Sequence, residues 1–535
     1  MYCLPLIAAA CCCGAALRVA AEVRVDPLFA DHMIVQRDAA VSIRGTLAPG
    51  DTVKVAFARE GADAVPIGAI VRDGVWSCDF PAHAASAEPW TFRIVTPAGE
   101  RVIRDVLIGD IWVCAGQSNM EFPLSREMHA KAILQGPSDP KVRILHHAFA
   151  GQYVFGTPLT PEDLAKLTPA LFYEGGWKTD SAEAAAPASA IGYCFARRIV
   201  RDTGVPVGIV DYAIGGAPIE TFVDAGTLAE HFPAKTTGDW TKNPALDAWS
   251  RGRASVHLGG RGAPADGTGP EHAYKPGFAW RAGPAKLAGF PVAGVLWYQG
   301  ETNAIGDERV AEYPALFATL VADWRERWRN PGLPFYFAQL SSCGSPPADR
   351  ALWGDFRDGQ RRAYLALKTG NTGSVFGKRE ADLRRPAEHP GPVGMIVTSD
   401  VGDPRDVHPR DKLTVADRFA RRALRDVYGK TGTTVSGPVA VAASLAHHAL
   451  VVRFEPGTAA GLKPVSGSKL AGFEIAGIDG KFVPAEATVK DDTLVVTGPK
   501  RLRPKTVRYA WKPVSDGNLV NAAGLPASTF RLGAD

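Results

Sequence analysis

The most constraining feature of the sequence is the stretch 106–123, which reads VLIGDIWVCAGQSNMEFP. Its apolar residues predict a buried strand, and Ala115 and Gly116 permit a sharp turn where that strand ends. Ser118 follows at the turn, ahead of a predicted helix. A serine there can present its hydroxyl and its backbone N–H to a substrate, as a nucleophile in acyl transfer must, although an isolated serine in such a turn is also a common helix cap.

Beyond this stretch, strands and helices alternate along the chain. Buried strands are predicted within 205–216, 293–301, 335–340 and 395–402, and helices at 191–199, 313–328 and 413–427, with Gly204 as the cap of the first helix. This alternation predicts an α/β fold with a parallel sheet covered by helices on both faces. Ligands in such folds bind at the carboxyl ends of the strands.

Two β-rich regions flank this α/β region. Alternating polar and apolar residues with Pro-Gly and Asp-Gly turns predict antiparallel β domains at 22–104 and 431–535, so that the catalytic domain would occupy 105–430. Trp76 and Trp90 in the first β domain suit either a packed core or a sugar-binding surface. Two stretches, 148–185 and 232–277, interrupt the alternation, and we interpret them as excursions over the active face.

The amino terminus, 1–21, has the small and apolar composition of a signal peptide and ends in Arg-Val-Ala-Ala, although it lacks an early Lys or Arg. We therefore expect a secreted or periplasmic protein, with a lipoprotein anchor as an alternative. The run is too short to span a membrane. With a dispersed net charge of +4 and no basic stripe, the 535-residue chain gives no indication of a nucleic-acid partner.

The remaining cysteines are Cys78, Cys114, Cys194 and Cys343, which are far apart and outside any metal-binding spacing. They are either buried thiols or two disulfides. No cofactor motif occurs in a fitting context, and Met120 occupies the position where an α/β-hydrolase elbow requires glycine. We therefore expect neither a metal nor a cofactor, and the oligomeric state is left open.

Besides Ser118, three polar clusters follow predicted strands. They are IGGAPIE at 214–220, WYQGETN at 297–303 and a carboxylate-rich loop at 400–409 that contains His408. Glycines let backbone N–H groups approach a ligand, and a histidine beside carboxylates suits a general base with an orienting partner. Each cluster alone is equally compatible with a structural loop, but together they supply a nucleophile, a base, an orienting acid and oxyanion donors.

The four blocks GQSNME, GGAPIE, WYQGETNA and DVHPRDK resemble those of the SGNH (GDSL-like) hydrolase superfamily, in the form seen in the sialate O-acetylesterase family. The resemblance extends over nearly the whole chain after residue 21. It implies a three-layer α/β/α flavodoxin-like domain and a serine esterase that removes acetyl groups from sugar hydroxyls without a metal.

The resemblance also implies roles for individual residues. Ser118 is the expected nucleophile and His408 the expected base. The expected oxyanion donors are the N–H of Ser118, the N–H of Gly215 or Gly216, and the side-chain amide of Asn303. The position three residues before the histidine, where many members carry the acid, is Arg405.

The orienting acid is therefore expected two residues before the histidine, at Asp406, with Asp403 and Asp400 as alternatives. Some members of the superfamily work with a Ser–His dyad and need little from the acid. Expected substrate-binding residues are Gln117, Gln299, Glu301 and Arg405. We expect Gln299 and Glu301 to serve partly as a hydrogen-bonded loop scaffold as well. Arg405 could pair with a sialate carboxylate or be a solvated loop charge.

The family resemblance favours O-acetylated sialic acid as the substrate, with acetylated xylan or another acetylated glycan as the alternative. A carbohydrate-binding protein with a degenerate hydrolase domain is a second hypothesis. The presence of Ser118, Gly216, Asn303 and His408 together argues against it. The sequence near the motifs contains no extended apolar segment, so a lipid esterase is not indicated.

Overall fold

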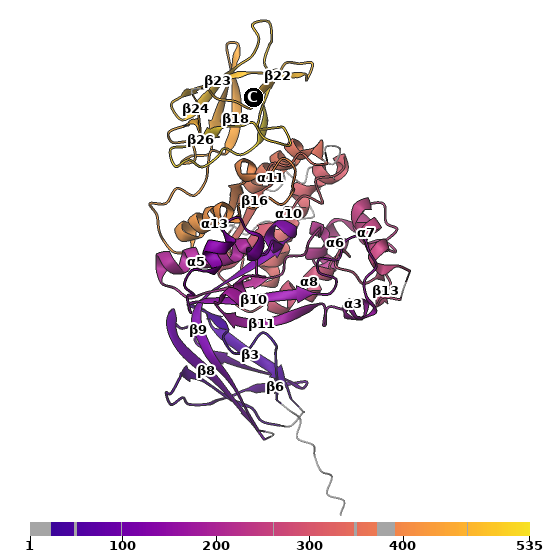
Figure 1. Cartoon of the computed structure of the whole chain (residues 1–535), viewed down its shortest axis with the longest axis vertical. Coiled ribbons are helices and arrows are strands. Elements are labelled where there is room, and N and C mark those ends of the chain that lie inside the picture. Colours follow the sequence, from indigo (N-terminus) through magenta and orange to yellow (C-terminus); the bar gives the residue numbers. More distant parts are fainter. Residues whose placement is uncertain are drawn as a thin grey trace, which may run out of the picture.

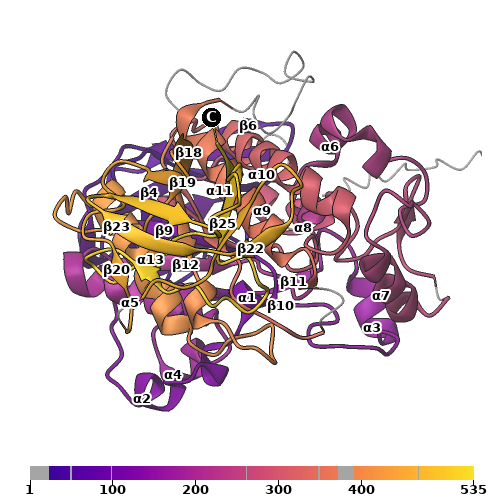
Figure 2. The same cartoon turned by 90° about the horizontal axis from the view of Figure 1, so that it is seen from above.

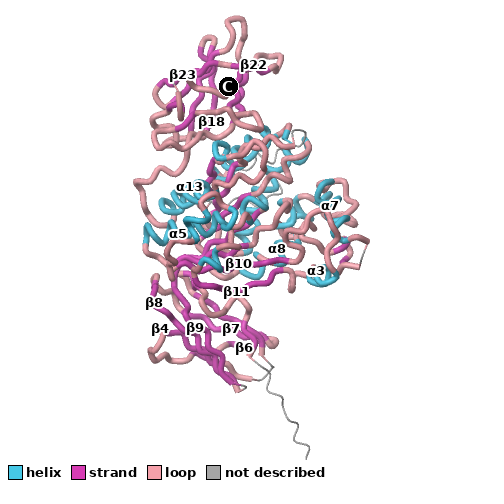
Figure 3. The backbone as a smooth tube through the Cα atoms, viewed as in Figure 1, coloured by secondary structure: helices cyan, strands magenta, loops and turns pink. Residues whose placement is uncertain are grey.

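A computed structural model describes residues 23–534 except 48–50, 98, 261, 347–349, 372–390 and 468. The predicted signal peptide, 1–21, lies outside the described residues. Figure 1 shows a strand-rich amino-terminal part, a mixed central part and a strand-rich carboxyl-terminal part stacked along the long axis. Figure 3 shows that the helices gather in the central part.

The amino-terminal part is mainly antiparallel, as its alternating sequence predicts, but β2 is parallel to β9. One sheet has the order β1-β3-β7-β6, and β4, β5 and β8 form another with β9. Trp76 is buried, and Trp90 packs against Phe57, with 4.8 Å between the ring centroids. The strands are β1 (Arg24–Val25), β2 (Ile34–Gln36), β3 (Val41–Thr46), β4 (Lys54–Arg59), β5 (Ile67–Gly68), β6 (Ile70–Arg72), β7 (Val75–Phe80), β8 (Ser86–Thr96) and β9 (Gly99–Gly116).

Strand β9 belongs to two parts of the fold at once. Its first half pairs with β8 in antiparallel fashion, whereas its second half is parallel to strands of the central sheet. The predicted boundary between 104 and 105 therefore falls inside a continuous 18-residue strand. This strand carries the chain directly from the amino-terminal part to Ser118.

The central sheet has the order β11-β10-β12-β9-β15-β16-β17. All neighbours are parallel except β10 and β11, which are antiparallel. The prediction of a purely parallel sheet was therefore wrong at this edge, because part of the expected excursion 148–185 folds back as β11. The strands are β10 (Val142–Phe149), β11 (Tyr173–Thr179), β12 (Val207–Asp211), β15 (Gly294–Tyr298), β16 (Phe335–Gln339) and β17 (Val393–Val397).

Helices pack on both faces of this sheet. Trp112 of β9 contacts Phe195, with ring centroids 4.9 Å apart, and Trp297 of β15 contacts Trp324 at 6.2 Å. Gly294 lies opposite Trp112 in the register, so alternation places Trp297 on the other face. The long helices are α5 (Ala190–Thr203), α10 (Asp307–Arg327), α11 (Trp353–Thr369) and α13 (Lys412–Asp426); α5 packs against α13, and α10 packs against α11.

Shorter helices and strands lie in the segments that connect these elements. Figures 1 and 2 both show α3, α6 and α7 together at one side of the sheet. The helices are α1 (Ser118–Glu121), α2 (Ala130–Leu134), α3 (Pro161–Lys166), α4 (Ala182–Ala185), α6 (Ala225–His231), α7 (Ala248–Leu258), α8 (Phe278–Ala282) and α9 (Pro284–Leu287). The short strands are β13 (Ala265–Asp266) and β14 (Gly269–Pro270), and the 3₁₀ turns include η2 (Ile219–Phe222) and η6 (Ser399–Val401).

The carboxyl-terminal part is a β module with its own apolar core. Hydrogen bonds from Arg361 to the Ala440 carbonyl (2.7 Å) and from the Thr529 N–H to Gln339 (3.1 Å) join it to the central part. Its strands are β18 (Ala440–Ala446), β19 (Ala449–Phe454), β20 (Lys463–Pro464), β21 (Phe473–Ala476), β22 (Phe482–Pro484), β23 (Glu486–Lys490), β24 (Thr493–Thr497), β25 (Thr506–Tyr509), β26 (Leu519–Val520) and β27 (Phe530–Gly533).

The two alternatives for the cysteines are resolved in favour of thiols. Cys78, Cys114, Cys194 and Cys343 are all free and buried. Burial raises the pKa of the Cys78 thiol to about 11, and it raises that of Cys194 to about 12. These thiols therefore behave as small core residues.

Candidate active site

Ser118 lies at the first position of α1, directly after β9. Gln117 is the N-cap residue, and its N–H donates to the Tyr298 carbonyl at 2.9 Å. Gly116 has a φ of 129°, and a Cβ there would stand 2.2 Å from the Tyr298 carbonyl oxygen. Only glycine permits this close approach of β9 and β15. The predicted turn thus presents Ser118 at the carboxyl end of a central strand.

The structure brings Ser118 and His408 together across 290 residues of chain. Serine Oγ lies 2.7 Å from His408 Nε2. On the other side of the ring, Nδ1 of His408 lies 3.3 Å from Oδ1 of Asp406, which also accepts the backbone N–H of His408 at 2.8 Å. The three side chains have the connectivity of a nucleophile, a base and an orienting carboxylate.

The other two candidate acids have different partners. Asp400 pairs with Arg418 through contacts of 2.7 and 2.6 Å, and Asp403 accepts the backbone N–H groups of Arg405 and Asp406. Asp406 is therefore the candidate carboxylate that pairs with His408. Its side chain is 53% exposed, which weakens the pairing through solvent screening.

The environment of His408 favours the neutral imidazole. Burial lowers its pKa from 6.5, and the positive charges of Lys412 and Arg126 act in the same direction, while Asp406 opposes them. A neutral Nε2 beside a serine hydroxyl can accept its proton.

A buried polar clamp fixes the His408 loop against α1. Asn119 donates to the Val407 carbonyl at 2.9 Å and to Glu301, and Lys412 donates to the Asn119 carbonyl oxygen. Burial lowers the pKa of Lys412 to about 7 and raises that of Glu301. Sequence reasoning missed Asn119 and Lys412, although both lie inside the motif blocks GQSNME and DVHPRDK.

Ser118 and His408 line a cavity of about 430 Å³. Gln117 and Glu301, both predicted to bind substrate, also line it. Glu301 is 5% exposed, and its Oε2 is buried without a hydrogen-bond partner among the described residues. That oxygen is an unpaired acceptor in the wall of the cavity.

Gly215 and Gly216 line the same cavity beside α1. A Cβ at Gly215 would lie 2.8 Å from Oε2 of Glu121 and 3.9 Å from Cβ of Ser118. Burial raises the pKa of Glu121 to about 7, against hydrogen bonds from Gln152 and the Gly215 backbone. Since the Gly215 backbone is engaged by Glu121, Gly216 is the better placed of the two glycines for an oxyanion.

Two predicted site residues, Gln299 and Asn303, lie behind the cavity wall. Both are fully buried, and neither lines the cavity. Gln299 donates to Gln117, to the Ala217 carbonyl and to Asn303 at 3.2, 3.2 and 2.7 Å. These contacts favour the second role expected for Gln299, that of a hydrogen-bonded loop scaffold, because its side-chain amide donates to groups of the protein.

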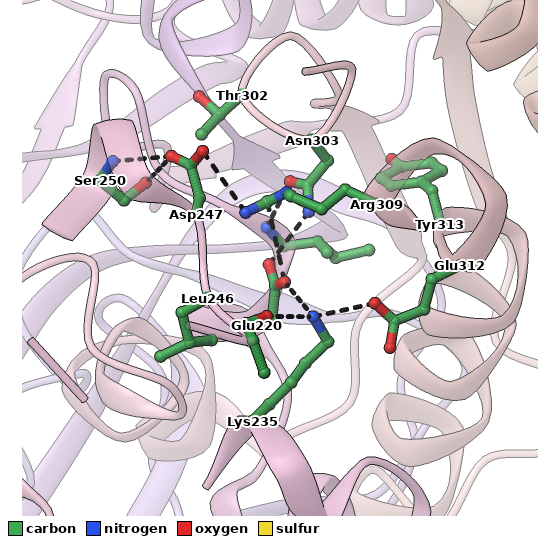
Figure 4. A network of polar contacts seen from close by, with 12 residues as sticks. Glu220, Lys235, Leu246, Asp247, Ser250, Thr302, Asn303, Arg309, Glu312 and Tyr313 are labelled. Carbon is green, nitrogen blue, oxygen red and sulfur yellow. Dashed lines mark hydrogen bonds and ion pairs between the residues drawn. The ribbon is translucent and has the colours of Figure 1, made fainter. Parts of the chain in front are cut away.

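Figure 4 shows the charged network behind Asn303. The Asn303 amide donates to Oε2 of Glu220 at 3.0 Å, and its carbonyl oxygen accepts the Ile219 N–H at 3.0 Å. Glu220 pairs with Lys235 at 3.1 Å and with Arg309 at 3.8 Å. These contacts fix the orientation of the Asn303 amide.

Arg405 is exposed and does not line the cavity, which favours the alternative of a solvated loop charge over a contact with substrate. Three other arginines, Arg126, Arg253 and Arg350, line the cavity instead. Sequence reasoning missed them because they lie outside the motif blocks.

Both expected excursions contribute to the cavity wall. Tyr153 and Phe155 come from 148–185, and Trp249 and Arg253 come from 232–277. Within the described residues, no cluster of His, Cys, Asp or Glu is suited to hold a metal ion, and no helix is long and apolar enough to cross a membrane.

Comparisons with known proteins agree with the sequence blocks. Residues 274–377 match the family described as carbohydrate esterase, sialic acid-specific acetylesterase. The chain is 26% identical to sialate O-acetylesterase of Rattus norvegicus over 354 residues and 27% identical to that of Homo sapiens over 362 residues, in each case covering 63% of this chain. The alignments span 60% and 57% of those relatives, respectively.

Among solved structures, a carbohydrate acetylesterase from Xanthomonas citri is similar over almost the whole chain. The TM-score is 0.74 at 29% identity, covering 95% of this chain and 99% of that one. This likeness supports a carbohydrate esterase fold for all three parts. Residues 274–377 thus match the sialic acid-specific acetylesterase family, and the resemblance of the chain to the sialate O-acetylesterase family is confirmed.

Proposed function

We propose that this protein is a serine carbohydrate esterase that removes O-acetyl groups from sugars. The observation that carries the proposal is the 2.7 Å contact between Ser118 Oγ and His408 Nε2 at the wall of a cavity. The similarity to sialate O-acetylesterases and to a carbohydrate acetylesterase supports the same chemistry. The helices on both faces of the central sheet suit the three-layer arrangement of SGNH hydrolases.

In the proposed reaction, Ser118 Oγ attacks the acetyl carbonyl carbon while His408 Nε2 takes the hydroxyl proton. The tetrahedral intermediate collapses as the C–O bond to the sugar breaks, and His408 returns the proton to the leaving sugar oxygen. Water then attacks the acetyl-enzyme with the same base, releasing acetate and regenerating Ser118. Asp406 holds Nδ1 and stabilises the transient imidazolium.

The negative charge that develops on the carbonyl oxygen needs donors. We assign the backbone N–H of Ser118 at the start of α1 and the N–H of Gly216 to this role. The second N–H of the Asn303 amide is a third candidate donor, although Asn303 lies behind the cavity wall and must reach the oxyanion from there. An amide group carries two N–H bonds, and Glu220 accepts only one of those of Asn303. Fixed donors of this kind stabilise the oxyanion without reorganising.

O-acetylated sialic acid is the substrate that we propose first. Its carboxylate, on the same sugar as the acetyl group, needs a cation in the cavity, and Arg126, Arg253 and Arg350 all line the cavity. Arg350 is 7% exposed, and its Nε is buried without a hydrogen-bond partner among the described residues. Acetylated xylan provides the comparison substrate because it lacks this carboxylate at the acetylated sugar.

The test is acetate release by the purified protein and by Ser118→Ala from 9-O-acetylated sialic acid, acetylated xylan and a small chromogenic acetate. We expect release from the sialate that disappears in the variant. Release from xylan alone would indicate that the substrate is a neutral acetylated glycan. Absence of release from all three, together with glycan binding, would support a carbohydrate-binding protein instead.

A further inference from the structure

The rim of the catalytic cavity carries exposed aromatic side chains. Tyr153, Phe155 and Trp249 are 51%, 63% and 42% exposed, yet all three line the cavity that contains Ser118 and His408. Aromatic side chains normally bury their faces. Their exposure at the cavity, on two segments separated by almost one hundred residues, indicates a surface that receives a ligand.

Trp249 lies next to the catalytic groups. It stacks on Tyr274 with a centroid distance of 5.9 Å and an interplanar angle of 26°, and the Tyr274 hydroxyl donates to the Gly215 carbonyl at 2.8 Å. A Cβ at Gly216 would stand 2.7 Å from the Trp249 ring. The indole is therefore adjacent to the proposed oxyanion donor, within one sugar ring of the reacting ester.

Arg253 joins two of these aromatic side chains, Phe155 and Trp249, into one surface. Its guanidinium lies 4.4 Å from the Phe155 centroid and 5.1 Å from that of Trp249. It also donates to the Val154 carbonyl at 3.2 Å, which ties the loop of Phe155 to α7. The two excursions are thus held in a fixed relation by cation–π contacts and a hydrogen bond.

The start of α7 is anchored in the buried network of Figure 4. Asp247 caps the helix by accepting the Ser250 N–H at 2.7 Å, and it pairs with Arg309 at 3.6 Å. Arg309 in turn pairs with Glu220, the acceptor of the Asn303 amide. The same network therefore holds both Trp249 and Asn303.

We propose that Tyr153, Phe155 and Trp249 form an aromatic platform for a second sugar ring, the one linked to the acetylated sugar. The preferred substrate is then an acetylated glycan chain rather than a free acetylated sugar. This inference rests on the proposed function. It goes beyond that function because it places a binding subsite outside the acetyl-transfer centre.

The charges of the cavity favour a sugar over an acyl chain as the occupant. Three arginines and the carboxyl groups of Glu121 and Glu301 share its wall with the aromatic side chains. The C–H face of a pyranose can cover an aromatic ring while its hydroxyls reach such charged groups, whereas a long acyl chain would leave them desolvated and unpaired.

The test compares the same acetylated sugar free and linked. The pairs are 9-O-acetyl sialic acid with 9-O-acetylated sialyllactose, and acetylated xylose with acetylated xylotetraose. The readout is the ratio of kcat/KM for the linked sugar to that for the free sugar, which cancels any general effect on the catalytic pair. In the pair that the wild type hydrolyses faster, we expect a ratio of about ten, corresponding to the stacking of one aromatic face.

Trp249→Ala should bring this ratio close to one, and Trp249→Phe should retain most of it. Val256→Ala is the matched control, because Val256 is an exposed apolar residue of the same helix that does not line the cavity. It should leave the ratio unchanged. A wild-type ratio near one, or a ratio that survives in Trp249→Ala, would overturn the platform.

Failure of the proposed function has a different signature. In that case the wild type hydrolyses neither these pairs nor a chromogenic acetate. Calorimetric titration of the wild type and Trp249→Ala with sialyllactose and xylotetraose then tests glycan binding by the platform without relying on ester hydrolysis. Weaker binding of either glycan by the variant supports the platform, and equal or absent binding of both overturns it.

Discussion

The buried carboxylate of Glu220 gives the sharpest stability prediction. Glu220 is 1% exposed and lies between Lys235 and Arg309, which are 3% and 12% exposed. Burial alone would raise its pKa, but the two cations and the hydrogen bond from Asn303 lower it from 4.5 to about 2. The folded state therefore favours the ionised form of this group.

The magnitude follows from this pKa. A tenfold change in proton affinity corresponds to about 1.4 kcal/mol, so a pKa of about 2 instead of 4.5 gives about 3 kcal/mol of stability at neutral pH. Breaking a buried ion pair by removing one partner costs about 3–5 kcal/mol. The two figures agree, and we expect Glu220→Gln to lower the free energy of unfolding by about 3 kcal/mol at pH 7.

The pH dependence has a definite sign. Because the folded pKa is depressed, the contribution is fully present above pH 4.5 and is lost as the pH falls toward 2. The difference between wild type and Glu220→Gln should therefore shrink to about half at pH 3. Urea unfolding followed by tryptophan fluorescence at the two pH values measures this difference.

Glu312→Gln provides the matched control. Glu312 pairs with the same Lys235 at 2.9 Å, but its side chain is 31% exposed. Partly exposed pairs contribute little, so we expect a loss below about 1 kcal/mol. A loss of that size in Glu220→Gln, or a difference that does not shrink in acid, would refute this reasoning.

Three further predictions concern the catalytic groups. In Lys412→Met the pKa of His408 should rise because a nearby positive charge is removed. The acid limb of the kcat/KM profile should therefore move to higher pH, and an unmoved limb contradicts this expectation. In Asp406→Asn the limb should move to lower pH, and kcat/KM should fall by less than about tenfold because the pairing is half exposed. In Asn303→Ala, kcat should fall by about 10²–10³; a fall below about fivefold, with an unchanged unfolding transition, would make Asn303 a scaffold residue.

Much of the fold could be predicted from local pattern. The apolar runs before Ser118 and around Val207 predict the central strands, and Gly204 ends α5 in the left-handed conformation with a φ of 75°. Helix α11 and the antiparallel strand β11 were missed. The place of β11 depends on pairing with β10, which a single stretch of sequence does not encode, whereas the periodic apolar residues of α11 would have indicated a helix.

The candidate site, too, could be predicted only in part from the sequence. Ser118 and His408 follow from their motif blocks, and the structure places them 2.7 Å apart. Arg405 and Gln299 were assigned to the substrate because of their proximity in sequence, but one is solvated and the other is enclosed. Trp249 could not be found from sequence, since its exposure depends on how α7 lies over the cavity.

The most direct test of the central claim is mass spectrometry of the protein quenched during turnover of an acetyl ester. We expect a transient acetyl group on the peptide that contains Ser118 in the wild type, and loss of both this acetyl group and acetate release in Ser118→Ala. Acetate release that persists in Ser118→Ala would contradict the claim that Ser118 is the nucleophile.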